Sequence, residues 1–239
     1  NPCLEMNMTV NMHESPALTL PVGPLETYIL HLADNALVLG HRNSEWCGHG
    51  PILEQDIAIS NISLDLIGQA RNCYQYAATL VNAKQKSDAA VPFTEDSFAY
   101  FRDSNAFRNL LLAEQPKGDW AYTILRQFLF SAWQSLLFEQ LKSSSDEQIA
   151  AIASKSLKEV TYHLRWSSEW VIRLGDGTEE SHNRLQNAVE TLWHFTDEMF
   201  IPSDFEKILI TEGVITNVAV LKEDWLKKVH SIFLEATLS

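Results

Sequence analysis

The stretch from Asp119 to Leu174 contains neither glycine nor proline, in a chain that has 9 glycines and 8 prolines. These two residues are the strongest interruptions of regular structure, so a stretch of this length without them can hold two long helices. We expect the first helix over about Trp120 to Leu141. The sequence Ser144-x-x-Glu147 is typical of a capping box and predicts the start of the second.

Two helices are also predicted upstream. Apolar residues recur every three or four positions from about Pro24 to Arg42, which is the period of an amphipathic helix. Gly50-Pro51 is expected to open the next helix, because proline is tolerated in a first turn, where its missing N–H would have no partner. That helix should continue to about Leu80 on an apolar stripe that includes Leu53, Ile57, Leu64, Ile67 and Tyr74.

The remaining elements are shorter. The central helical pair should end near Leu174, where Gly175-Asp176-Gly177 offers a left-handed stop. Short helical pieces and loops are expected from Val91 to Gly118, and further helices over about His182 to Phe200 and Val220 to Ala236.

Strand-like alternation is scarce, and Leu209 to Val218 is the only ambiguous patch. The sequence therefore predicts an all-α protein, a bundle of long helices with additional shorter ones. Nothing in the middle of the chain has the composition of a linker, so we expect one domain over residues 23–239. Residues 1–22 are expected to form a flexible N-terminal extension.

Composition and charge exclude several classes of protein. Apolar residues make up 46% and charged residues 21% of the chain, which is ordinary globular usage and argues against intrinsic disorder. The net charge of -13 argues against nonspecific binding to a phosphate backbone, although a local basic patch for a nucleotide-like thioester is compatible with it. No secretory signal and no apolar run long enough for a membrane span are visible.

Three cysteines, Cys3, Cys47 and Cys73, form no C-x-x-C pair. Their odd number fits reduced thiols in the cytoplasm better than a disulfide framework. A glycine-rich phosphate loop, a G-x-S-x-G elbow and an H-E-x-x-H helix are all absent from the sequence. The interior of the bundle is then the main place to look for chemistry.

Glu159 and His163 lie on one face of the predicted fourth long helix. A carboxylate-bridged di-iron site needs about four acids and two histidines from four helices, with Glu-x-x-His on two of them. This chain instead has Glu-x-x-x-His three times, at Glu45/His49, Glu159/His163 and Glu190/His194. Its single Glu-x-x-His, Glu179 to His182, follows the predicted helix stop and is expected at the surface.

Two aspartates are further candidates. Asp65 belongs to a polar stripe of Asn61, Asp65, Gly68 and Asn72 on the second long helix. It could be held by an ion pair, with Arg71 as a partner, or serve as a metal ligand; the ion pair is the commoner outcome inside a bundle. Asp34, on the first helix, could point inward at the same level or face solvent.

The third long helix lacks the acid that a metal pair would require. Ser131 and Ser135 occupy positions on its inner face where a carboxylate would be needed, and Glu139 comes too near the helix end. Hydroxyls can satisfy a polar core but are poor ligands for iron. We therefore hypothesise that Asp34, Asp65, Glu159 and His163 form a metal-free, hydrogen-bonded network in a vestigial site, with no catalytic residue in this chain.

Several motifs carry a resemblance to a known family. They are Leu32-Ala-Asp-Asn35, Glu45-Trp-Cys-Gly-His49, Leu64-Asp-Leu-Ile-Gly-Gln-Ala-Arg71, Glu114-Gln-Pro116, Tyr162-His-Leu-Arg165 and Arg173-Leu-Gly-Asp-Gly177. In this order, over about Leu25 to Leu238, the chain resembles the C subunits of bacterial ring-1,2-phenylacetyl-CoA epoxidases, also called phenylacetate-CoA oxygenases. Members of that family usually continue into a glycine- and histidine-containing tail, whereas this sequence stops at Ser239.

The resemblance implies a ferritin-like four-helix bundle and a place in a heteromeric monooxygenase of phenylacetate catabolism. In that family a related A subunit holds the di-iron centre and epoxidises the ring of phenylacetyl-CoA, and a reductase supplies electrons. The C subunit has no working metal site and supports the catalytic subunit structurally. The resemblance thus implies no cofactor in this chain, a homo- or hetero-oligomer with the di-iron subunit as partner, contact with phenylacetyl-CoA only through the complex, and no nucleic acid or membrane.

Two other functions are compatible with the residues. One is a metal-dependent ferritin-like oxygenase or oxidase that is active in its own right, which would show oxygen-dependent turnover by this chain alone. The other is an adaptor unrelated to oxygenation, suggested by the helical surface and the acidic charge, which would associate with a different partner.

Overall fold

The computed structural model describes residues 22–85 and 91–238. Within these residues all regular structure is helical, and no strand is present. Apart from Val22, the predicted N-terminal extension lies outside the described residues. The all-α prediction is confirmed, including the ambiguous patch, which becomes the end of one short helix followed by a loop. No helix in the described part of the chain is long and apolar enough to cross a membrane.

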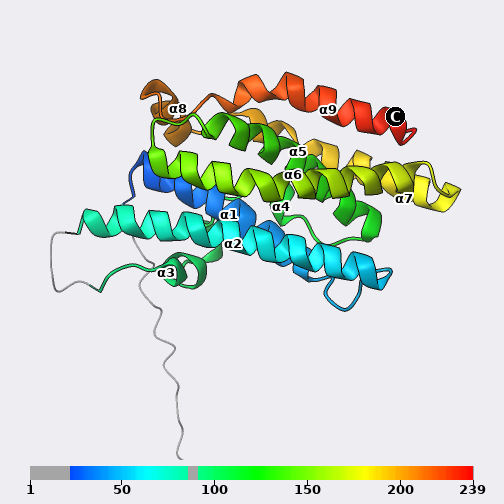
Figure 1. Cartoon of the computed structure of the whole chain (residues 1–239), viewed down its shortest axis with the longest axis horizontal. Helices are drawn as coiled ribbons and strands as arrows, with labels where there is room; N and C mark the ends of the chain where they lie inside the picture. Colours follow the sequence, from blue (N-terminus) through cyan, green and yellow to red (C-terminus); the bar gives the residue numbers. More distant parts are fainter. Residues whose placement is uncertain (1–21, 86–90, 239) are drawn as a thin grey trace, which may run out of the picture.

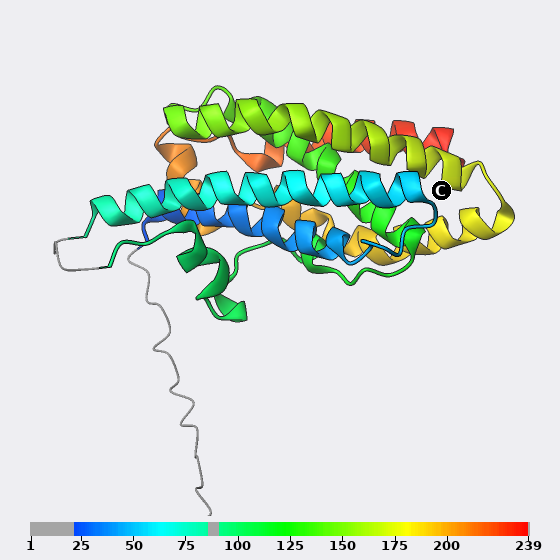
Figure 2. The ribbon, with the colours of Figure 1, turned by 60° about the horizontal axis from the view of Figure 1, so that its bottom comes forward.

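Four long helices form a ferritin-like bundle (Figures 1 and 2). Helix α1 (Pro24–Ser44) packs antiparallel to α2 (Leu53–Ala83), and α5 (Trp120–Leu141) packs antiparallel to α6 (Glu147–Gly175). The two pairs contact each other through α2 and α6. The helix predicted over Trp120 to Leu141 has those bounds in the structure.

A long connection from the end of α2 to the start of α5 crosses back along the bundle. It carries α3 (Glu95–Tyr100), a 3-10 turn (Ser104–Ala106) and the short α4 (Leu111–Glu114). Such a crossover lets α2 and α5 run in the same direction in a bundle of four helices. The short helical pieces predicted over Val91 to Gly118 correspond to this connection.

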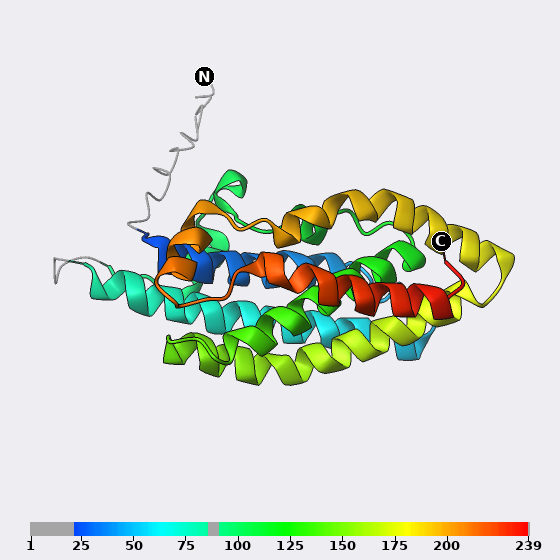
Figure 3. The ribbon, with the colours of Figure 1, turned by 90° about the horizontal axis from the view of Figure 1, so that it is seen from above.

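Further helices pack outside the four long ones, on the α5–α6 pair and, for α8, on α1 (Figure 3). They are α7 (Glu179–Leu192), α8 (Asp204–Thr211) and α9 (Lys222–Glu235), with 3-10 turns at Trp193–Phe195, Asp197–Phe200 and Val218–Leu221. The single helix predicted from His182 to Phe200 is wrong in its second half, where the chain tightens into 3-10 turns.

Helix α5 is buried on nearly all sides, which explains why it carries so few charges. It contacts α6, α7 and α9, and its side chains bond to Asn43 of α1 and Gln69 of α2. Trp225 of α9 donates its indole N–H to the carbonyl of Leu129, 3.1 Å away, and Trp133 donates to the carbonyl of Met199, also at 3.1 Å. These bonds satisfy the only polar atom of each buried ring and fix the outer helices on α5.

The start of α6 differs from the predicted capping box. Asp146 is the N-cap, and its carboxylate accepts from the backbone N–H of Ile149 at 2.9 Å. Ser144 instead accepts from the Asp146 N–H and donates to the carbonyl of Val214. Aspartate is as good an N-cap as serine, so the sequence offered two caps, and the contact with Val214 selects between them.

The interpretation of the α2 sequence also needs correction. Pro51 precedes the N-cap, Ile52, and is not in the first turn. Of the predicted apolar stripe, Leu53, Ile57 and Leu64 are 71%, 51% and 66% exposed. The core face is a neighbouring stripe that contains Ile59, Ile62, Leu66, Ala70 and Cys73. Helix α2 has apolar residues on two faces, and periodicity alone does not show which one is buried.

The predicted left-handed stop after α6 is wrong as well. Positive φ angles occur at Gly48, Gly118 and Gly213, but at neither Gly175 nor Gly177. Gly175 is needed for a different reason, because a Cβ atom there would lie 2.2 Å from the backbone oxygen of Ala236. The glycine lets the segment after α9 pack directly on the end of α6.

This contact predicts the effect of a single methyl group. Gly175→Ala should lower the free energy of unfolding by roughly 1–3 kcal/mol, because the overlap is with backbone that must shift. Gly68→Ala is the matched control: a Cβ atom at this helical position meets nothing within 4 Å. It should raise stability by roughly 0.5–1 kcal/mol through helix propensity. Urea unfolding of both variants measures the difference, and equal stabilities would contradict the assigned contact.

Candidate functional site in the bundle interior

Asp65 and His163 join α2 to α6. The imidazole Nε2 lies 3.0 Å from a carboxylate oxygen of Asp65. The His163 side chain is fully buried, whereas that of Asp65 is 38% exposed. Since a carboxylate only accepts, Nε2–H is the donor, and Nδ1 faces the interior without a partner among the described residues. Asp65 therefore lies at the edge of the bundle, and Arg71, its predicted partner, pairs with Glu95 instead.

Glu159 belongs to a second group, one turn away on α6. Its carboxylate accepts from the amide of Gln69 at 2.9 Å, and the amide oxygen of Gln69 accepts from Gln134 of α5 at 3.1 Å. This chain of bonds links α6, α2 and α5 through two neutral amides. Gln134 is buried and lies next to the predicted position Ser135. Ser135 itself donates to the carbonyl of Ala132 in its own helix.

A third group of hydrogen-bonded side chains lies nearer the N-terminal end of α5. Asn43 of α1 donates to Gln127 at 2.6 Å, and Gln127 donates to the hydroxyl of Ser131 at 2.7 Å. Arg126 reaches Asn43 and the carbonyls of Gln115 and Pro116 at the end of the crossover connection. Burial lowers the pKa of the Arg126 guanidinium to about 10, so it stays charged at neutral pH.

Asp34 does point inward, but to an arginine. Its fully buried carboxylate forms an ion pair with the buried Arg102 and accepts from the Tyr74 hydroxyl at 2.6 Å. It also accepts from the backbone N–H of Arg108 at 2.8 Å, while the neighbouring Asn35 accepts from the N–H of Leu110 at 2.7 Å. These bonds anchor the crossover connection to α1.

The environment of Asp34 is strongly desolvated. Burial, and then the charge of Asp34, raise the pKa of the Tyr74 phenol far above its usual value and that of the Cys73 thiol to about 12. Both groups are therefore neutral at physiological pH. The Tyr74 hydroxyl donates to the carboxylate and accepts from Arg102 at 3.1 Å, and Cys73 behaves as an apolar core residue.

The donor set does not fit a di-iron pair. The four predicted residues fall into three separate groups: Asp34 with Arg102 and Tyr74, Asp65 with His163, and Glu159 with Gln69. The single network hypothesised for them is therefore wrong. In the described part of the chain no three acidic, histidine or cysteine side chains come together as a metal site. Amides and hydroxyls occupy the interior, and they offer a metal no negative charge.

The other Glu-x-x-x-His pairs lie outside this interior. Glu45 and His49 are exposed in the loop after α1, where Glu45 pairs with Arg42. In the Glu-x-x-His pair, Glu179 is exposed and His182 is half-buried, with its ring bonded to the carbonyl of Gly175.

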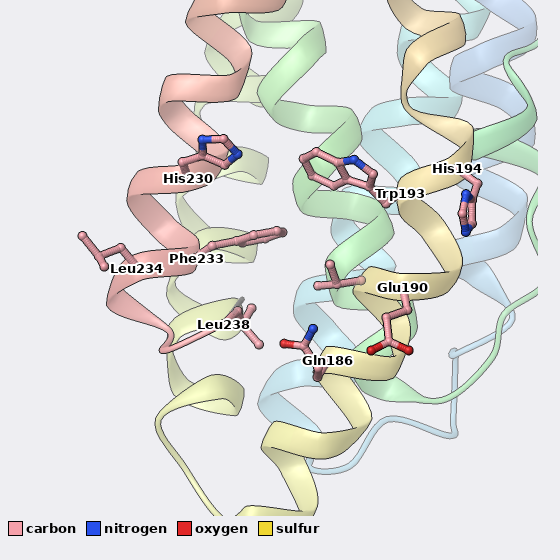
Figure 4. Close-up of a pocket in the computed structure, with 9 residues that line it drawn as sticks. Gln186, Glu190, Trp193, His194, His230, Phe233, Leu234 and Leu238 are labelled. Atoms are coloured by element: carbon pink, nitrogen blue, oxygen red, sulfur yellow. The ribbon is translucent and has the colours of Figure 1, made fainter.

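Glu190 and His194 line a groove between α7 and α9 (Figure 4). The groove has a volume of about 590 Å³. It is lined mostly by apolar atoms, and Phe233 and Trp193 are among the lining residues. Trp193 stacks on His230 of α9, with ring centroids 6.4 Å apart. Glu190, His194 and His230 form no metal site here, since they surround an apolar groove without converging.

Sequence reasoning missed the residues that fill the interior. Arg102 comes from the crossover connection, 68 residues from Asp34, and no spacing rule relates the two. Gln69 lies on the second long helix but outside its polar stripe of Asn61, Asp65, Gly68 and Asn72. Arg126, Gln127 and Gln134 had a detectable signal, because they are long polar side chains within a helix that is otherwise apolar.

The buried ion pair predicts a large loss of stability on removing one partner. Arg102→Met should lower the free energy of unfolding by about 3–5 kcal/mol, because it leaves Asp34 buried and uncompensated. Arg71→Met, which breaks the exposed pair with Glu95, should cost about 0–1 kcal/mol. Denaturant unfolding of both variants tests the contrast. A small effect of Arg102→Met would mean that the carboxylate is reached by water.

The Asp65–His163 pair predicts a smaller effect that depends on the substituted side chain. Asp65→Ala should destabilise by about 1–3 kcal/mol, because it leaves the buried Nε2–H of His163 without an acceptor. Asp65→Asn keeps an acceptor oxygen and should cost less. Thermal unfolding measures both, and the interpretation fails if the two variants are equally stable.

Two comparisons with known proteins bear on this geometry. Residues 15–239 match the family model described as "Phenylacetic acid catabolic protein". Over 215 residues the chain is 45% identical to the C subunit of 1,2-phenylacetyl-CoA epoxidase from Escherichia coli (strain K12). This alignment covers 90% of the present chain and 83% of the relative.

Proposed function

Because the chain belongs to the phenylacetic acid catabolic protein family, we propose that it is the C subunit of a multicomponent phenylacetyl-CoA epoxidase. In this proposal the chain carries out no redox chemistry. It stabilises and positions a related di-iron subunit, which epoxidises the aromatic ring of phenylacetyl-CoA during aerobic phenylacetate catabolism. The whole complex, rather than this chain, is the oxidoreductase.

The observation that carries the noncatalytic role is the chemistry of the bundle interior. Gln69 bonds to Gln134 and to a single acid, Glu159, and Gln127 bonds to Asn43 and Ser131. Iron pairs in such bundles are held by several carboxylates, whose negative charge balances that of the metal. Neutral amides bond to each other without a cation, although the amide oxygen of Gln134 and Nδ1 of His163 have no partner among the described residues.

The fold itself supports a structural role beside a related subunit. The crossover connection is tied to α1 through Asp34 and Asn35, and the outer helices are fixed on α5 through Trp133 and Trp225. The bundle is thus braced by polar contacts at α1 and at the buried helix α5. A rigid scaffold of this kind suits a subunit whose function is to hold a catalytic relative in shape.

The proposal predicts the distribution of iron and activity. The chain, purified after expression in iron-supplemented medium, should contain far less than one iron per chain by elemental analysis. The catalytic subunit from the same source, prepared in parallel, should contain about two, as a di-iron carboxylate protein does. Oxygen consumption with phenylacetyl-CoA and reductase should require the catalytic subunit.

Two results would contradict this account. One is stoichiometric iron in the isolated chain, and the other is oxygen-dependent turnover by this chain without the catalytic subunit. Either would favour an oxygenase or oxidase that is active in its own right. Co-purification with an unrelated protein but not with the catalytic subunit would instead favour an adaptor.

A further inference from the structure

The outer surface of α2 has an exposed apolar row. Leu53, Ile57 and Leu64 are separated by four and seven residues, so they lie on one face of the helix, opposite its core side. Each is more than half exposed. Single exposed aliphatic side chains are ordinary on a protein surface. A row of them at helical spacing, on the solvent side of a helix, is typical of an interaction surface.

Helix α6 runs beside α2 (Figure 2) and has a row of cations on its own outer surface. The bonds from Asp65 to His163 and from Gln69 to Glu159 fix this arrangement. Lys158, Arg165 and Arg173 are exposed and follow one another at spacings of seven and eight residues, which places them on one face. Glu169 lies in the same row, so the row has a net positive charge.

These cations have no acidic partner in the described part of the chain. Among the residues that the structure describes, Lys158, Arg165 and Arg173 form no salt bridge. Arg165 lies over the ring of Tyr162, and Arg173 over that of Trp170. In a protein with a net charge of -13, an unneutralised basic row is unusual and is available to an acidic partner.

We propose that the apolar row of α2 and the basic row of α6 together form the surface that docks the related di-iron subunit. This inference rests on the proposed function. The partner surface is expected to be helical, with an apolar stripe that covers Leu53, Ile57 and Leu64 and acidic side chains that face the basic row. Burial of the aliphatic row supplies affinity, while the charges set orientation.

A second copy of this chain fits the surface less well. It presents the same two rows, so an isologous contact would set cations against cations or cations against leucines. Neither arrangement neutralises the basic row, and like charges facing each other disfavour the wrong partner. A head-to-tail contact with an acidic region of a second copy would leave both rows free at one end and produce open chains.

The test uses the full chain and the catalytic subunit of the same epoxidase, with the dissociation constant measured by calorimetry. Leu64→Glu should weaken binding by at least about tenfold, because it buries a charge in the contact. Arg165→Glu should weaken it by a similar factor at low salt and less at high salt, because the contribution is electrostatic. Both positions are exposed, and thermal unfolding verifies that the variants are folded.

Matched controls come from α9, outside the two rows. Leu234→Glu replaces an 80% exposed leucine at the α7–α9 groove, and Lys228→Glu reverses an exposed charge on α9. Both should bind like the wild type. If Leu234→Glu abolishes binding and Leu64→Glu does not, the docking surface is the groove, and the present assignment is wrong.

Two further outcomes separate this inference from the proposed function. The wild-type chain could bind the catalytic subunit while neither Leu64→Glu nor Arg165→Glu weakens that binding. The assigned docking surface would then be wrong, while the proposed function would stand. If the wild type does not bind that subunit, the proposed function and the surface both fail. The wild-type chain could also form a dimer that Leu64→Glu converts to a monomer. That result would assign this face to a second copy of the chain and overturn the inference.

Discussion

Hydrogen bonding between neutral amides, inside a bundle of four long helices, is the constraint on which this structure depends. A buried polar group must find a partner, and a ferritin-like interior leaves room between its helices for long polar side chains. Here Gln69 and Gln134 join α2, α5 and α6, and Gln127 and Asn43 join α5 to α1. These amides bond to one another without a cation, and they carry no negative charge that would attract one.

The carboxylates of Asp34 and Asp65 both have hydrogen-bonding partners within the fold. Asp34 is fully buried, but Arg102, Tyr74 and two stretches of the crossover connection converge on it and its neighbour Asn35. Asp65 remains at the edge of the bundle and accepts from the buried His163. The acids that first suggest half of a metal site thus have structural tasks, either closing the crossover or satisfying a buried imidazole.

The extents of the four long helices could be read approximately from the sequence, because they depend on local rules. The absence of glycine and proline gave the bounds of α5 and the length of α6. The buried face of α2 could not be read, since that helix has two apolar faces and only packing shows which is covered. The partner of Asp34 could not be read either, because the crossover brings Arg102 to it over 68 residues. Likewise, the glycine at 175 is explained by the approach of Ala236, not by a local turn.

The central claim is that this chain supports a metal centre without containing one. The most direct measurement is X-ray diffraction, on both sides of the iron absorption edge, from crystals in which this chain is bound to the catalytic subunit. The account predicts anomalous density for a pair of iron ions in the catalytic subunit and none between α2, α5 and α6 of this chain. An iron peak beside Glu159 and His163 would contradict it.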